Sequence, residues 1–284
     1  MRRLKIIHST LYDFAETVRL GPHRLLLRPR EGHEVHIETS LLETTPPASV
    51  HWLRDLYDNS VALATFNAST RRLAIQSEVV VQHYADAPLD FIVADHAVNY
   101  PFRYEAESAA VLRPFMIDPQ APAEQGVLRG WLARRWQVGQ QVQTYSLLET
   151  LCRDIKQTLT YQVREEPGVQ TAAETITRGI GSCRDFANLF MMSARQLGLA
   201  ARFVSGYLDT PSATSGATHA WAEVYLPGAG WKGFDPTLGV VVGNKHIAVA
   251  VARWSDAVSP VAGTFYGPPG ATLSVSVSVN ALPA

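Results

Sequence analysis

Two different hydrophobic patterns divide this chain near residue 120, and the division limits the folds that it can adopt. Before that point apolar residues alternate with polar ones, as at Val35, Ile37 and Leu41, and turn signals such as the Gly-Pro pair at 21–22 separate the runs. A repeat of two residues is typical of strands with one buried face. Several short strands at this spacing predict an antiparallel β-sandwich over residues 1–120.

The second part of the chain, residues 121–284, places its predicted helices before its predicted strands. Apolar residues recur at helical spacing at Leu147, Leu148, Leu151 and Ile155, for example. The predicted helices cover residues 124–136, 146–159, 171–178 and 182–197, and the predicted strands cover 201–208, 219–226, 231–235, 246–251 and 272–279. This order favours an α+β domain in which helices pack on an antiparallel sheet, and we expect the last two strands to close that sheet.

The composition is that of a compact protein without a strong charge. Of the 284 residues, 46% are hydrophobic, and the formal net charge of −1 gives no reason to expect nucleic acid or a membrane as partner. No apolar run approaches the length of about 18 residues that spans a membrane, and the apolar run near the N-terminus is too short for a signal peptide. Cys152 and Cys183 make no disulfide framework, so we expect a cytoplasmic protein. The sequence has no cysteine pairs typical of zinc sites and no carboxylate-dense calcium site, so we expect neither metal nor cofactor; the oligomeric state stays open.

Cys183 lies where a helix is predicted to begin. Glycines end a loop just before it, Ser182 is a candidate N-cap, and Asp185 stands three residues later, as in a capping box. The apolar stripe that follows, through Phe186 and Phe190, predicts a buried helix with Cys183 on its inward face. Unpaired N–H groups in the first turn of a helix favour negative charge, so we expect this thiol to have a lowered pKa and to be nucleophilic.

His219 and Asp235 lie on two predicted strands that form a hairpin. If its loop has an odd number of residues, Tyr225 pairs with Trp231, and His219 lies diagonal to Asp235 on one face, with backbones roughly 7–8 Å apart. An even loop would put Asp235 on the opposite face. Contact between the two side chains therefore requires an odd loop or a bulge.

Each of these residues also has a structural interpretation. Alone, Cys183 could be a buried structural thiol, His219 a core histidine and Asp235 a turn residue before a proline. A thiol, an imidazole and a carboxylate together are instead what nucleophilic catalysis by cysteine requires. Cys152 stands among apolar helical positions, and we predict that it packs in the core.

Three more residues are candidates for the wall of a substrate cleft. Trp221 and Glu223 share the predicted strand face of His219, and Trp231 lies on the returning strand. Hydrophobic packing explains the two tryptophans equally well.

Four motifs, in this order and spacing, resemble the bacterial transglutaminase-like superfamily, whose members have a papain-like core. They are GSCRDFA at 181–187, GLAARFVSGY at 198–207, HAWAEVY at 219–225 and GFDPT at 233–237. The resemblance extends to HSTLY at 8–12 and LGPHRLLLRP at 20–29, which are similar to the β-rich region that precedes this core in many bacterial members, and to HIAVA at 246–250.

The resemblance implies a catalytic triad of Cys183, His219 and Asp235 that opens an amide bond through a thioester on the cysteine. It also implies a peptide or protein substrate. Many bacterial members with this N-terminal region are regarded as cysteine peptidases, so we expect a thiol-dependent amide hydrolase, either a peptidase or an amidase. Two alternatives stay open: a transglutaminase that passes the acyl group to an amine, and a non-catalytic peptide-binding module on the same fold.

Overall fold

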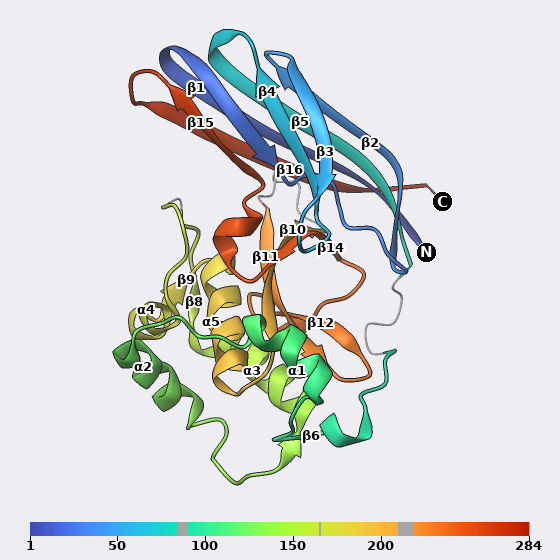
Figure 1. Ribbon diagram of the computed structural model, residues 1–284, viewed down its shortest axis with the longest axis vertical. Coiled ribbons are helices and arrows are strands. Elements are labelled where there is room, and N and C mark those ends of the chain that lie inside the picture. The colour runs from blue at the N-terminus through green and yellow to red at the C-terminus, as the bar shows by residue number, and fades with distance from the viewer. Residues whose placement is uncertain (85–89, 165, 210–217, 284) are drawn as a thin grey trace.

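The computed structural model describes residues 1–84, 90–164, 166–209 and 218–283. A β-rich part lies above a mixed part that holds the α-helices (Figure 1). The same order of strands, helices and strands is expected from the sequence, and the α+β class is confirmed.

The β-rich part is one antiparallel sheet of seven strands. Its strands are β1 (Arg2–Leu25), β2 (Val35–Thr45), β3 (Ala48–Arg54), β4 (Ser60–Phe66), β5 (Ser69–His83), β15 (Val261–Tyr266) and β16 (Ala271–Leu282). Their order is β2-β5-β1-β4-β3, and β15 and β16 also pair with β1. Buried residues such as Leu4 and Ile6 alternate along β1 with partly exposed neighbours, as expected for a strand that covers a core with one face. Hydrogen bonds join all seven strands into one sheet, and the finer expectation of a two-sheet sandwich stays a prediction.

The C-terminal strand does not close the core sheet, contrary to the expectation for residues 272–279. It pairs with β1 of the N-terminal sheet, from Arg3 opposite Leu282 to Phe14 opposite Ala271 (Figure 1). Strict alternation specifies a half-buried strand but carries no information on which sheet supplies its partner. The division into residues 1–120 and 121–284 stays a prediction, with the addition that β15 and β16 complete the N-terminal sheet.

The mixed part is built on a second antiparallel sheet, of five strands. Its strands are β10 (Ala201–Leu208), β11 (His219–Leu226), β12 (Gly230–Asp235), β13 (Val240–Val241) and β14 (His246–Ala252), in the order β13-β12-β11-β10-β14. The four predicted strands between residues 201 and 251 are confirmed.

Helices pack on this sheet, as predicted, and α5 lies closest to its centre. The α-helices are α1 (Ala106–Leu112), α2 (Pro122–Leu132), α3 (Thr144–Thr158), α4 (Ala172–Arg178) and α5 (Cys183–Gln196). Shorter elements are η1 (Asp95–Ala97), η2 (Arg113–Phe115), η3 (Ser255–Val258), β6 (Asn99–Tyr100), β7 (Val142–Gln143), β8 (Thr160–Tyr161) and β9 (Ile180–Gly181). Phe190 of α5 stacks on Phe234 of β12 with ring centres 5.2 Å apart, and α5 also contacts β10 and β11. Within the described part of the chain, no helix has the length and apolar character needed to cross a membrane.

The two sheets share one hydrophobic core. Leu4 and Ile6 of β1 belong to the same buried cluster as Tyr207 of β10 and Phe186 of α5. The hydroxyl of Tyr207 also donates to the carbonyl oxygen of Leu27 at 3.2 Å. The N-terminal sheet therefore supports the strands that carry the candidate site.

Candidate active site

Cys183 is the first residue of α5, and its neighbours fix the start of that helix. The N–H and the hydroxyl of Ser182 both donate to Asp185 Oδ2, each at 2.8 Å. The predicted helix start and the capping role of Asp185 are thereby confirmed. Cys183 is half-buried and packs against the main core. Its sulfur lies at a helix end where unpaired N–H groups favour a negative charge.

Asp185 also ties α5 to the preceding segment of the chain. The carboxylate is fully buried, and it accepts the N–H of Gln170 at 2.7 Å and Nε of Arg164 at 2.9 Å. Burial favours the neutral acid, but the hydrogen bonds from Gln170, Ser182 and Arg164 outweigh burial and lower the pKa of Asp185. Arg184 donates in turn to the carbonyl oxygen of Arg164 at 3.1 Å. The helix that begins at Cys183 is thus anchored by a buried carboxylate.

The β11–β12 hairpin brings His219 and Asp235 into contact. Tyr225 pairs with Trp231, and the following pair leaves residues 227–229 as the loop, so the odd loop that the sequence requires is confirmed. Nε2 of His219 lies 2.7 Å from Oδ2 of Asp235.

The imidazole of His219 contacts a carboxylate and has the thiol of Cys183 among the groups that influence it. Because Nε2 faces Asp235, Nδ1 is the ring nitrogen left free to interact with Cys183. Burial of the ring disfavours its charged form, but the hydrogen bonds with Asp235 and Cys183 outweigh burial and raise the pKa of His219 to about 10. The ring is therefore an imidazolium at neutral pH, poised to donate a proton.

Asp235 is fully buried at the end of β12. Its Oδ1 accepts the backbone N–H groups of Thr237 at 2.9 Å and Leu238 at 3.2 Å. Burial would favour the neutral acid, but hydrogen bonds from His219 and His246 outweigh it and hold the pKa of Asp235 well below its usual range. The carboxylate is therefore ionised throughout the neutral range.

His246 is a site residue that the sequence did not single out. It is the first residue of β14, and its Nε2 lies 3.0 Å from the same Oδ2 of Asp235 that faces His219. The family-like segment at 246–250 was recognised as a strand, but β14 and β12 are separated in the sheet by two other strands. Contact between His246 and Asp235 depends on that strand order, which a local pattern does not carry.

Asp235 and the two histidines that contact it, His219 and His246, also form a group that could hold a metal ion. One ligand atom from each of His219, Asp235 and His246 lies within 4.8 Å of the others. Hydrogen bonds from the two imidazoles to the carboxylate already account for this approach. The expectation of no metal stays a prediction.

Cys152, the second cysteine, is part of the core, as predicted. Its Sγ lies 3.5 Å from the carbonyl oxygen of Val240. Burial, and the nearby charge of Asp235, raise the pKa of this thiol far above its usual range. Cys152 is therefore a chemically inert counterpart to Cys183.

The three cleft candidates do not gather around one cleft. Trp221 is only 1% exposed and has no open surface to offer, contrary to the expectation that it lines a cleft. Its ring packs against the rings of His246 and His219, with centres 5.3 and 6.1 Å away, and occupies the space above Gly206, which has no side chain. Trp221 thus packs against both histidines and helps to hold their rings in place.

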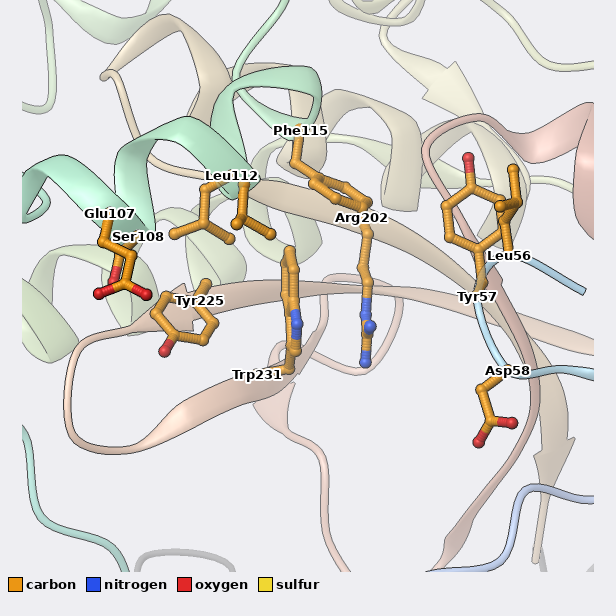
Figure 2. A pocket seen from close by; sticks show the side chains of 11 residues that line it. Leu56, Tyr57, Asp58, Glu107, Ser108, Leu112, Phe115, Arg202, Tyr225 and Trp231 are labelled. Atoms are coloured by element: carbon orange, nitrogen blue, oxygen red, sulfur yellow. The ribbon is translucent and has the colours of Figure 1, made fainter.

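Trp231 lines a separate cavity of about 540 Å³, and Glu223 reaches that cavity only through Arg202, one of its lining residues (Figure 2). Trp231 lines the cavity together with Arg202, whose guanidinium stacks on the indole at 4.2 Å from the ring centre. Glu223 holds that guanidinium through a 2.6 Å contact between its Oε2 and Nε of Arg202. Neither His219 nor Asp235 lines this cavity, so a role for Trp231 and Glu223 in substrate binding stays a prediction.

Two family models match the chain. The model of the transglutaminase-like superfamily matches residues 132–236, a range that contains Cys183, His219 and Asp235. The model of the bacterial transglutaminase-like N-terminal region matches residues 4–82, which form most of β1 to β5.

Whole-chain relatives and a solved structure agree with these matches. An uncharacterized protein of Mycobacterium leprae is 24% identical over 291 residues, covering 99% of this chain and 100% of the relative. An uncharacterized protein of Mycobacterium tuberculosis is 28% identical over 295 residues, covering 98% of this chain and 92% of the relative. A crystal structure of a candidate cysteine protease from Cytophaga hutchinsonii aligns with a TM-score of 0.74 at 19% identity, over 100% of this chain and 91% of that one. The last likeness shows that the two proteins share a fold.

Proposed function

The chain belongs to the transglutaminase-like superfamily, and from that premise we propose that it is a thiol-dependent amide hydrolase, a cysteine peptidase or amidase. One observation supports the proposal: the imidazole of His219 contacts the carboxylate of Asp235 at 2.7 Å, and the thiol of Cys183 is near enough to act on the pKa of the same ring. A nucleophile, an acid–base group and an orienting group in this relation are what acyl transfer requires.

In the first half of the proposed reaction, Cys183 is acylated. The sulfur, as thiolate, forms a bond to the carbonyl carbon of the substrate amide, and the negative charge moves to the carbonyl oxygen. The N–H of Cys183 at the start of α5 is placed to stabilise that oxyanion. Nδ1 of His219 then gives its proton to the amide nitrogen, the C–N bond breaks, and an amine leaves behind a thioester.

In the second half, water releases the acyl group. Nδ1 of His219, now without its proton, accepts a proton from water while the water oxygen attacks the thioester carbon. The C–S bond breaks, a carboxylic acid leaves, and the thiolate and imidazolium are restored. Asp235 keeps Nε2 of the ring protonated throughout, so that Nδ1 is always the nitrogen that exchanges the proton.

Hydrolysis is favoured over transfer by the solved relative, which is described as a candidate cysteine protease. We infer a peptide or protein as the substrate class, since the reacting group is an amide. If the acyl group passes to an amine instead, the same thioester forms and only the second half of the reaction differs.

The first test is alkylation of the native protein with iodoacetamide at mildly acidic pH, with labelled sites identified by mass spectrometry. Rapid labelling of Cys183 is expected, with Cys152 as an internal control that stays unlabelled in the core. His219→Ala should slow the labelling of Cys183. If both cysteines label slowly in the wild type, Cys183 is not activated, and the non-catalytic peptide-binding alternative takes its place.

The second test separates hydrolysis from transfer. The protein is incubated with a peptide library, with and without an added primary amine, and the products are read by mass. New carboxyl termini that require Cys183 are expected. Incorporation of the amine into glutamine side chains would replace the hydrolase by a transglutaminase.

A further inference from the structure

Two imidazoles share a single carboxylate oxygen. Nε2 of His219 lies 2.7 Å, and Nε2 of His246 lies 3.0 Å, from Oδ2 of Asp235. The N–H of Gly243 donates to Nδ1 of His246 at 3.4 Å. Because Nδ1 accepts that hydrogen bond, the N–H of the ring is on Nε2 and points at Asp235.

We propose that His246 is a positioning residue for the reaction, which keeps Oδ2 of the Asp235 carboxylate directed at His219. This inference rests on the proposed function and adds a side chain to the three that act there. His246 does not touch the reacting atoms, because His219 stands between Cys183 and the carboxylate.

The need for a second donor follows from the surroundings of the carboxylate. Asp235 is fully buried, and an ionised carboxylate away from water is stable only if hydrogen bonds replace its hydration. The backbone N–H groups of Thr237 and Leu238 serve Oδ1 alone. On Oδ2 the two imidazoles are the donors, and His246 is the one that takes no part in proton transfer.

Among the titratable groups that surround Asp235, His246 is the one suited to be this second donor. The titratable side chains around the carboxylate are His219 from β11, His246 from β14, Cys152 from α3 and, further away, Tyr161 from β8. Cys152 and Tyr161 are both kept neutral at neutral pH, chiefly by burial, which raises their pKa values. When His219 changes its bond to Cys183 or to a substrate, His246 is the donor that stays in place.

His246 is itself rigidly held. Its side chain is buried, and its ring meets the indole of Trp221 edge to face, with ring centres 5.3 Å apart and an angle of 77°. Its backbone is paired with Leu208 of β10. Because the indole of Trp221 and the pairing with β10 restrict the ring of His246, that ring can hold the Asp235 carboxylate in one orientation.

Three substitutions separate the hydrogen bond from the volume of the ring. In His246→Gln, the amide nitrogen reaches about as far as Nε2 of the ring and can donate to Oδ2. His246→Leu fills the space without a donor, and His246→Asn has the same amide on a shorter side chain that stops short of Asp235. Comparing Gln with Asn therefore tests the hydrogen bond even if the leucine variant does not fold.

The readout is the rate of alkylation of Cys183 by iodoacetamide between about pH 4 and pH 9, with thermal unfolding measured on each variant. In the Leu and Asn variants the acidic limb of the profile should move to higher pH, with labelling slowed about tenfold on that limb, because a carboxylate that is no longer directed at His219 stabilises the imidazolium, and with it the neighbouring thiolate, less well. The Gln variant should follow the wild type. A loss of stability alone would not shift a pH profile or be reversed by glutamine.

The inference is overturned if folded Leu or Asn variants label Cys183 with the wild-type profile, or if Gln is as impaired as Asn. A failure of the proposed function looks different, since it is seen in the wild type itself. In that case Cys183 labels as slowly as Cys152, and His219→Ala changes nothing.

Discussion

Asp185→Asn removes the charge that anchors the helix of Cys183 while nearly preserving the shape of the side chain. The carboxylate accepts hydrogen bonds from the Gln170 N–H, the Ser182 N–H and hydroxyl, and Arg164 Nε, at distances from 2.7 to 2.9 Å. An amide offers one acceptor oxygen and turns an NH₂ group towards donors on its other side. The substitution therefore leaves buried donors unsatisfied and takes away the counter-ion of Arg164.

The magnitude follows from the burial of that ion pair. The side chain of Arg164 is 14% exposed and that of Asp185 is fully buried. Breaking a buried pair by removing one partner costs about 3–5 kcal/mol. Arg164 keeps a second, exposed partner in Glu166 at 3.5 Å, so we expect the lower end, a loss of about 3 kcal/mol of unfolding free energy.

Glu174→Gln is the matched control, because Glu174 has the same capping role at the start of α4. It accepts the N–H of Thr171 at 2.8 Å, but its side chain is 47% exposed. Water can replace the lost interaction there, and we expect a cost of at most about 1 kcal/mol.

Urea unfolding followed by tryptophan fluorescence at neutral pH measures both variants. Because the pKa of Asp185 is lowered on folding, its contribution is full above the unfolded value of about 3.9 and is lost as the pH falls through the folded pKa. The difference between wild type and Asp185→Asn should therefore shrink in acid. Equal losses in Asp185→Asn and Glu174→Gln at neutral pH would refute the reasoning.

Four more outcomes are expected. Asp235→Asn should move the alkaline limb of amide hydrolysis to lower pH, because Asp235 helps to raise the pKa of His219 to about 10; an unmoved limb in a pH–rate profile would count against this. Gly206→Ala should cost about 1–3 kcal/mol in thermal unfolding, since its Cβ would overlap neighbouring backbone and ring atoms. Gly126→Ala, in open space on α2, should instead be neutral or stabilise by up to about 1 kcal/mol. Deletion of residues 271–284 should give aggregation in size-exclusion chromatography, because an edge of β1 loses its partner, and a monodisperse, folded product would contradict this.

Local signals in the sequence predicted the elements that carry Cys183, His219 and Asp235. The capping box of Ser182 and Asp185 located the start of α5 to the residue, because its hydrogen bonds connect positions only three apart. The hairpin register could be reduced to an odd or an even loop for the same reason. The requirement for an odd loop came from the chemistry expected of the two side chains, and the pairing of Tyr225 with Trp231 meets it.

Features set by distant parts of the chain could not be predicted in this way. The partner of β16 is a strand at the other end of the sequence, and the contact of His246 with Asp235 depends on the order of strands in the core sheet. The sequence correctly predicts that Trp221 lies on the same strand face as His219. It does not predict that the ring packs over Gly206 and is buried there. In each case the face of the element was predictable and its neighbour was not.

The pairing of Arg3 with Leu282 has a consequence for how this protein is made. During synthesis β1 leaves the ribosome long before β16, the strand that pairs with one of its edges, has been translated. The α-helices and the five-stranded sheet are translated between these two strands. We expect nascent chains halted before residue 271 to remain chaperone-bound or protease-sensitive. A circular permutant in which a short linker joins β16 directly to β1 should let these two strands pair at once, and it should fold faster.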